Sequence, residues 1–190
     1  MKKQVLVTAV GEDRPGIVAK LTEVLVKHGA NLEESRMSVL GGEFAAISLV
    51  TVPEEKMASL EKDLAELKSH TISVTTKHTK ALDPKRFSEH TCLQIDLSGA
   101  DHEGIVHKVS AFLRDRDINI QSMDTDVVHA PETGTPLFRM KGLIQVPAKL
   151  KQADLQKSLD EIGNSESVEI SLTKAASEQA NALLGAGSNR

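Results

Sequence analysis

The chain is short of aromatic side chains: its 190 residues include four Phe and neither Trp nor Tyr. The buried cores must therefore be aliphatic, built from Val, Leu and Ile. The same shortage leaves few ring faces on which unpaired nucleic-acid bases could stack. An excess of basic charge is also missing, because 23 Lys and Arg stand against 27 Asp and Glu. Direct binding of DNA or RNA is therefore not expected.

Cysteine and long apolar runs are scarce as well. The single cysteine, Cys92, has no partner for an internal disulfide and lies in an alternating stretch typical of a strand. The seven histidines have no metal-ligand spacing, so neither a metal nor another cofactor is expected. No apolar stretch is long enough to cross a membrane, and the first residues lack the apolar centre of a signal peptide. These absences favour a cytoplasmic protein without a membrane partner.

An internal repeat becomes visible when the sequence is compared with itself at an offset of 88 residues. The stretch VTAVGEDRPGIVAKL (7–21) then falls on IDLSGADHEGIVHKV (95–109), and further along Asn31 falls on Asn119. Towards the end of each copy the offset grows to 94, and the extra residues lie around HAPETGTP (129–136), a turn marked by Pro and Gly. Two copies of one domain explain this pattern.

Each copy shows the same succession of strands and helices, because apolar residues alternate in some segments and recur with helical spacing in others. In the first copy, strands are expected at 4–10, 30–40, 43–52 and 71–77. Helices are expected to begin at the turn before Ile17 and at Pro53, with apolar stripes of Ile17, Val18, Leu21, Val24 and Leu25, and of Met57, Leu60, Leu64 and Leu67. In the second copy, strands are expected at 91–98, 118–128, 137–146 and 168–172, with helices over 104–114 and around Leu155, Leu159 and Ile162.

The order β-α-β-β-α-β predicts an α+β protein made of two ferredoxin-like domains in tandem. Each domain should hold a four-stranded antiparallel sheet with both helices on one face. Gly41 and Gly42 should form the hairpin between the middle strands of the first copy. The expected boundaries are 1–78 for the first domain, 79–89 for a linker, 90–175 for the second domain and 176–190 for a flexible tail.

The turn from the first strand to the first helix can be explained by structure alone. Pro15 suits a first helical turn, and Asp13 could cap that helix by accepting from its free amides. This interpretation does not explain the choice of two residues, Gly16 and Asn31. Gly16 is expected inside the first helical turn, where alanine would be more stable by up to ~1 kcal/mol. Asn31 opens the second strand although asparagine is a poor strand former. We interpret the glycine as making room for a group that approaches the backbone.

The polarity of these residues matches the charged end of a free amino acid. The amides at a helix start favour a carboxylate, and the Asp13 carboxylate favours an ammonium group. The Asn31 amide can donate to one and accept from the other. This hypothesis expects the helix start and the neighbouring strand edge to flank one crevice.

The segments GEDRPGIVAKL…GANL and GADHEGIVHKV…DINI resemble the ACT domain family, small regulatory modules that bind amino acids at interfaces between paired modules. The resemblance covers about residues 3–175, although the second copy lacks the Arg and Pro of the motif. It implies ligand contacts at Gly11, Asp13, Arg14, Pro15, Gly16, Ile17 and Asn31, and in the second copy at Asp101, His102, Gly104, Ile105 and Asn119. A tandem pair without an attached enzyme is most similar to the group of glycine cleavage system transcriptional repressors.

This resemblance implies a non-enzymatic regulator that binds glycine or serine, controls a protein partner such as a transcriptional regulator, and can form homo-oligomers. A second interpretation stays open: the glycine turns are purely architectural, and the chain is a ligand-independent dimerisation or docking scaffold whose strand edges join. Catalysis is not expected. Asp124 and Asp126 share one strand face, but no nucleophile or base motif accompanies them.

Overall fold

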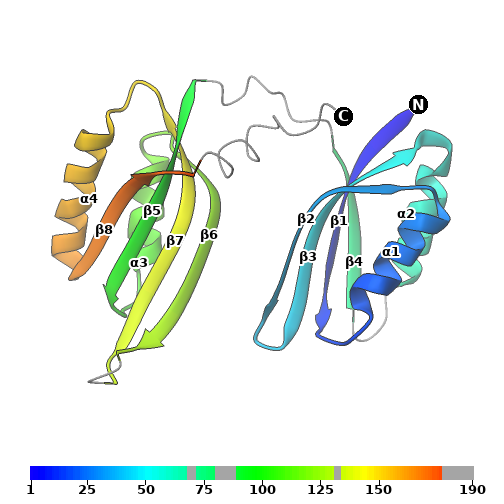
Figure 1. Ribbon diagram of the computed structural model, residues 1–190, viewed down its shortest axis with the longest axis horizontal. Coiled ribbons are helices and arrows are strands. Elements are labelled where there is room, and N and C mark those ends of the chain that lie inside the picture. The colour runs from blue at the N-terminus through cyan, green and yellow to red at the C-terminus, as the bar shows by residue number, and fades with distance from the viewer. Residues whose placement is uncertain (68–71, 80–88, 131–133, 177–190) are drawn as a thin grey trace. The chain divides into compact units, whose positions relative to one another are not determined.

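The computed structural model describes residues 1–67, 72–79, 89–130 and 134–176, and the chain divides into two compact units (Figure 1). Unit 1 comprises Met1–Ala81 and unit 2 comprises Leu82–Arg190. The linker predicted at 79–89 and the tail predicted at 176–190 lie almost entirely outside the described residues. Each unit is described by itself below.

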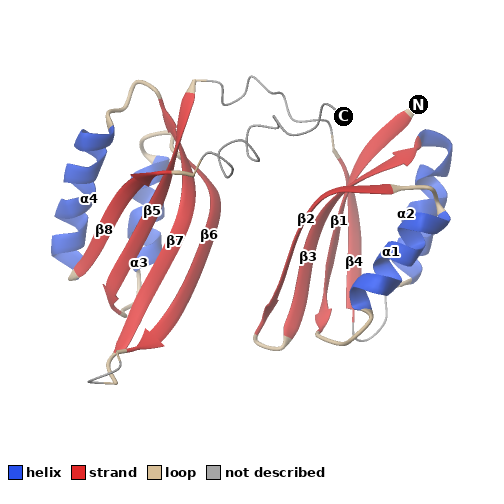
Figure 2. Cartoon of the chain, in the orientation of Figure 1, coloured by secondary structure: helices blue, strands red, loops and turns tan. Residues whose placement is uncertain are grey.

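Both units follow the same order of elements (Figure 2). Unit 1 contains β1 (Lys2–Glu12), α1 (Ile17–Lys27), β2 (Asn31–Leu40), β3 (Glu43–Pro53), a 3-10 helix η1 (Glu54–Lys56), α2 (Met57–Glu66) and β4 (Ile72–His78). Unit 2 contains β5 (His90–Ala100), α3 (Ile105–Arg114), β6 (Asn119–His129), β7 (Pro136–Pro147), α4 (Gln152–Glu166) and β8 (Val168–Lys174). Pro53 therefore ends a strand and precedes a 3-10 turn, and does not open α2 directly as predicted.

Each unit holds one four-stranded antiparallel sheet, with strand order β2-β3-β1-β4 in unit 1 and β6-β7-β5-β8 in unit 2. Both helices of a unit cover one face of its sheet (Figure 1). We call this the helix face and the other the open face. The α+β prediction of two ferredoxin-like domains in tandem is confirmed. The hairpin at Gly41 and Gly42 is confirmed too, since both residues have positive φ, 60° and 84°.

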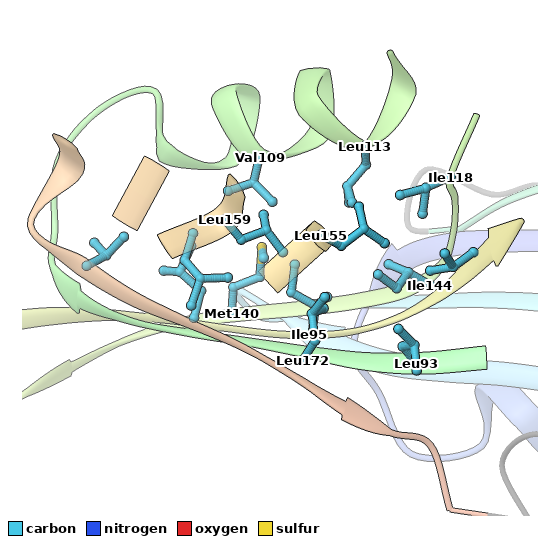
Figure 3. Packing of buried hydrophobic residues seen from close by; sticks show 14 of the residues in the cluster. Leu93, Ile95, Val109, Leu113, Ile118, Met140, Ile144, Leu155, Leu159 and Leu172 are labelled. Atoms are coloured by element: carbon cyan, nitrogen blue, oxygen red, sulfur yellow. The ribbon is translucent and has the colours of Figure 1, made fainter. Parts of the chain in front are cut away.

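The core of each unit lies between the helix face and the two helices. Alternate residues of β1, namely Val5, Val7 and Ala9, are buried because a strand directs every second side chain to the same face. Leu21 and Leu25 of α1 meet them. In unit 2, the strand, α3 and α4 residues interdigitate in the same way (Figure 3). Burying each such Leu or Ile stabilises the fold by roughly 1.5–3 kcal/mol.

The predicted helix stripes are largely confirmed. Leu155 and Leu159 are buried in α4, with Ile162 half-buried beside them. Val18 is the exception, because 40 % of it stays exposed. It lies on the flank of α1, beside the residues that face the sheet. The observed buried stripe is therefore one residue narrower than the predicted stripe.

Candidate functional site

The segment before α1 is a reverse turn that requires glycine. The Ile17 amide donates to the Arg14 carbonyl at 3.4 Å, so Arg14 to Ile17 form a four-residue turn. Gly16 has φ 92° and ψ −1°, the conformation of the third residue of a type II turn. Pro15 occupies the second position, which favours proline. The Asp13 amide donates to the Gly42 carbonyl at 2.9 Å and holds the turn against the β2–β3 hairpin.

Two expectations about this turn are wrong. The residue preceding α1 is Gly16, and no side chain caps the helix, so Asp13 is not its cap. Pro15 and Gly16 both precede the first helical residue, so the glycine is required by its positive φ and not by a position inside the helix. A Cβ placed on Gly16 would meet no atom within 4 Å. Among the described residues, the space beside this backbone is therefore open.

The turn offers groups that suit a zwitterion. The first helical hydrogen bond runs from the Lys20 amide to the Gly16 carbonyl, so the Val18 and Ala19 amides have no acceptor in the helix. Asp13 is exposed. Arg14 pairs with Glu12 at 2.6 Å, and both side chains are 55 % exposed. The helix start thus combines unpaired donors with a carboxylate in solvent.

Asn31 lies at the other end of the sheet. It pairs with Thr51, and Thr51 pairs with Gln4 at the start of β1. Gly11 at the end of β1 pairs with Phe44. The seven steps along β1 from Gln4 to Gly11, at about 3.4 Å each, separate the two positions by roughly 24 Å. One unit therefore does not bring Asp13 and Asn31 to a shared crevice, and this expectation is wrong.

The Asn31 side chain is engaged locally. Its Nδ2 donates to Glu33 Oε1 at 3.0 Å, and this hydrogen bond, with another from Thr51, holds the pKa of the Glu33 carboxyl below its usual range. Among the other predicted contacts of unit 1, Gly11 is a buried residue of β1 and Ile17 packs against the core. Asp13, Arg14, Pro15 and Gly16 remain together at the exposed turn.

Unit 2 repeats the turn with different side chains. Gly104 has φ 93° and ψ −8°, and a Cβ there would again meet no atom within 4 Å. Asp101 and His102 are exposed in this turn, whereas Ile105 is only 2 % exposed and belongs to the core. Asn119 lies at the far end of the sheet and donates to Gln145 Oε1 at 2.8 Å.

His102 connects the turn of unit 2 to the end of α4. Its Nδ1 lies 3.1 Å from the Glu103 carbonyl oxygen, and its Nε2 lies 3.0 Å from the Glu166 carbonyl oxygen. These two hydrogen bonds, and then the carboxylates of Glu166 and Asp101, raise the pKa of the His102 imidazole. Lys108 of α3 also pairs with the Glu166 carboxylate. Side-chain contacts with Glu166 thus hold the turn of unit 2 at the end of α4, and the turn of unit 1 differs in this respect.

A hollow of about 640 Å³ lies on the open face of unit 2 and contains none of the predicted contact residues. The charged residues that line it are Asp96, Asp124, Asp126, Arg139, Lys141 and Glu169. Arg139 donates to the Asp126 carboxylate through Nε at 3.1 Å, which lowers the pKa of that carboxyl. The sequence predicted that Asp124 and Asp126 share one strand face. It did not predict which residues of the neighbouring strands complete the hollow, because strand register determines that.

Ser59, His28 and Asp63 form a row that sequence reasoning did not find, because α1 and α2 bring them together. Ser59 Oγ lies 3.2 Å from His28 Nδ1, and His28 Nε2 lies 2.8 Å from Asp63 Oδ2. The Ser59 hydroxyl also donates to the Lys56 carbonyl at 2.9 Å. The Ser59 hydroxyl has one hydrogen, which it can donate either to this carbonyl or to His28 Nδ1. The row connects the two helices.

Across residues 1–67, 72–79, 89–130 and 134–176, no three His, Cys, Asp or Glu side chains converge as metal ligands. No helix within these same ranges has the length and apolar character needed to cross a membrane.

Comparison with known proteins places this geometry in a family. Residues 3–79 match the model of the ACT domain. The glycine cleavage system transcriptional repressor of Escherichia coli is 25 % identical over 157 residues, 80 % of each chain. A UPF0237 protein of Methanosarcina mazei is 32 % identical over 79 residues, which are 40 % of this chain and 86 % of that protein.

A solved structure extends the similarity over both units. The crystal structure of an unknown protein from Galdieria sulphuraria is 28 % identical, with a TM-score of 0.77, and the match covers 93 % of this chain and 100 % of that one. The matched family model spans unit 1, and unit 2 repeats the same strand order and the same glycine turn. The chain therefore belongs to the ACT domain family, as a tandem pair of such domains.

Proposed function

We propose that the chain is a non-enzymatic regulator that binds a small amino acid, glycine or serine, at the β1–α1 turn of unit 1. The observation that carries this proposal is the open space beside Gly16, next to helix amides without acceptors and the exposed Asp13 carboxylate. The amides suit the ligand carboxylate and Asp13 suits its ammonium group. The choice of a small ligand rests on the Escherichia coli relative, which is named a glycine cleavage system transcriptional repressor.

The site becomes complete when two copies of unit 1 pair through β2. This strand is at the edge of its sheet and, within the described residues, pairs only with β3. Antiparallel pairing across a two-fold axis sets the Asn31 end of one β2 against the Leu40 end of the other. Leu40 lies at the end of the sheet that carries the Asp13–Gly16 turn. Asn31 of one copy then reaches the turn of the other copy.

Exposed apolar residues support this pairing. They lie on the flank of α1 and along β2, where a neighbouring copy would cover them: Val18, Val26, Leu32, Met37 and Val39. Val26 is 75 % exposed and Val39 is 49 % exposed, unusual values for apolar residues of regular elements that border the core. Ligand held between two copies would favour the paired state, and differential affinity for that state is what regulation requires.

The partner is proposed from similarity. The relative from Escherichia coli is named a glycine cleavage system transcriptional repressor. We propose that this chain controls a transcriptional regulator in the cytoplasm through protein contact, because its charge balance does not favour direct nucleic-acid binding. No catalytic role is included in the proposal, since the relative that supports it is named a transcriptional repressor.

Isothermal titration of the full chain against the twenty amino acids tests the binding. We expect heat with glycine or serine, and a loss of affinity of about tenfold or more in Asp13→Ala and in Asn31→Ala, because each removes a hydrogen bond to a charged group. Glu23→Ala, an exposed change on α1, is the matched control and should bind normally. Absence of heat with every amino acid refutes binding, and normal affinity in Asp13→Ala refutes this site.

A ligand-independent scaffold is the second candidate, because the apolar flank and the β2 edge alone can drive association. Light scattering with and without amino acids separates the two functions. A mass that changes with glycine or serine supports the regulator. A dimer of constant mass that ignores all amino acids supports the scaffold.

A further inference from the structure

The hydrogen bonds of His102 define its protonation state. Each ring nitrogen lies 3.0–3.1 Å from a backbone carbonyl oxygen, that of Glu103 on one side and that of Glu166 on the other. A carbonyl oxygen can only accept. Neutral imidazole carries a single N–H, so it can satisfy one of these contacts and must face the other with a lone pair. Both contacts are favourable only in the imidazolium form.

The charged groups around His102 support the same form. From α4, the Glu166 carboxylate lies 3.7 Å from Nε2 and is also held by Lys108 of α3. From the turn itself, Asp101 adds a favourable negative charge and Glu103 supplies its carbonyl. Lys108 opposes the imidazolium, but its charge is neutralised by Glu166, and it holds the pKa of that carboxyl below its usual range. The arrangement favours a positive ring.

We propose that His102 is a proton-dependent latch that fastens the β5–α3 turn of unit 2 to the end of α4. Nδ1 of protonated His102 donates to the Glu103 carbonyl within the turn, while Nε2 donates to the Glu166 carbonyl and lies near the Glu166 carboxylate. Deprotonation removes one of the two donors and the attraction to that carboxylate, so the turn is held less firmly to α4. Glu166 lies 64 residues from His102 in the sequence, so the latch joins segments that the chain connectivity leaves independent.

The latch belongs to unit 2 alone. The repeat position of His102 in unit 1 is Arg14, which pairs with Glu12 at the end of β1. The two ACT domains therefore differ at this turn, because unit 2 carries an imidazole where unit 1 carries a guanidinium. This inference stands without the amino-acid site proposed for unit 1.

The direction of the pH dependence follows from the raised pKa of His102. A group whose pKa is higher in the folded than in the unfolded chain stabilises the fold fully below the unfolded value, close to 6.5. The stabilisation is lost as pH rises through the folded value. The latch is therefore closed below about pH 6.5 and weakens as pH rises through the folded pKa, which lies above that value.

Nuclear magnetic resonance on the full-length chain tests the latch. A histidine ring titration should give His102 a pKa above 6.5, and the hydrogen-exchange protection factors of the turn amides should fall between pH 6 and a pH above that measured pKa. In His102→Asn these protection factors should be low and equal at both pH values. His107→Asn, an exposed change on α3, is the matched control and should keep the wild-type difference.

Glu166→Gln provides a second variant that keeps the backbone carbonyl and removes the carboxylate. It should lower the pKa of His102 and shift the loss of protection to lower pH without abolishing it. A His102 pKa at or below 6.5 overturns the proposal. So does a turn in His102→Asn that keeps the protection and the pH dependence of the wild type.

Discussion

Replacing Gly16 tests the physical origin of the turn that the ligand hypothesis depends on. Gly16 has φ 92°, and a Cβ added there would meet nothing within 4 Å. The cost of a side chain at this position must therefore come from backbone conformation and not from collision. A series of Asn, Ala and Val at this one position separates the two causes, because conformational cost and side-chain volume rank these residues differently.

The magnitude follows from two opposing contributions. A left-handed backbone costs a residue with a Cβ roughly 1–2 kcal/mol. Removing glycine also restricts the unfolded chain, which stabilises the protein by roughly 0.4–1 kcal/mol. The balance predicts a loss of about 1 kcal/mol for Gly16→Ala. Asn tolerates positive φ and should lose less, whereas β-branched Val should lose more.

Urea unfolding followed by circular dichroism measures the loss. The chain has no Trp or Tyr, so intrinsic fluorescence is of little use, and amide NMR signals of unit 1 should be followed in parallel to assign the transition. The loss of stability is expected to be smallest for Asn, larger for Ala and largest for Val. If Asn proves more damaging than Ala, the loss follows side-chain volume, and the space beside Gly16 is not open in the folded chain.

Three further predictions concern stability. Asp117 has φ 56° at the repeat position of Gly29, so Asp117→Gly should raise the free energy of unfolding by roughly 0.5–1 kcal/mol. Gly29→Asp in unit 1 should lower it. A denaturant midpoint that falls in Asp117→Gly or rises in Gly29→Asp would contradict this. His28 is 8 % exposed and bonds Asp63 and Ser59, so His28→Ala should cost about 1–3 kcal/mol in the same assay, and an unchanged midpoint would show that the clamp contributes nothing. Hydrogen bonds from Lys27 and His28 hold the pKa of Asp63 below its usual 3.8. The ionised Asp63 therefore stabilises the fold above that pH, and this stabilisation is lost as pH falls through the folded pKa. In Asp63→Asn the free energy of unfolding should lack this part of its dependence on acid pH.

The sequence already contained most of the fold. Alternation of Val5, Val7 and Ala9 predicted a strand with one buried face, since side chains of a strand alternate with period two. The pair Gly41 and Gly42 predicted a hairpin, since only such a turn needs two adjacent positive φ values. These features are local, and local geometry is determined by a few consecutive residues.

The sequence alone could not place the candidate site. It predicted the right turn, but it assigned a cap to Asp13 that the structure does not form. It also set Asn31 beside that turn, whereas the strand register puts it at the opposite end of the sheet. A sequence repeat shows that two positions are equivalent in their own copies; it does not show which positions are neighbours in space.

By itself, then, the sequence determined the duplication, the strands and helices, the aliphatic core and the glycine that the turn needs, because each depends on spacing along the chain. Only the tertiary structure decided that Asp13 and Asn31 lie apart within a unit, that His28 clamps α1 to α2, and that His102 reaches Glu166. These contacts join residues far apart in sequence, and strand pairing and helix packing alone fix the distances between them.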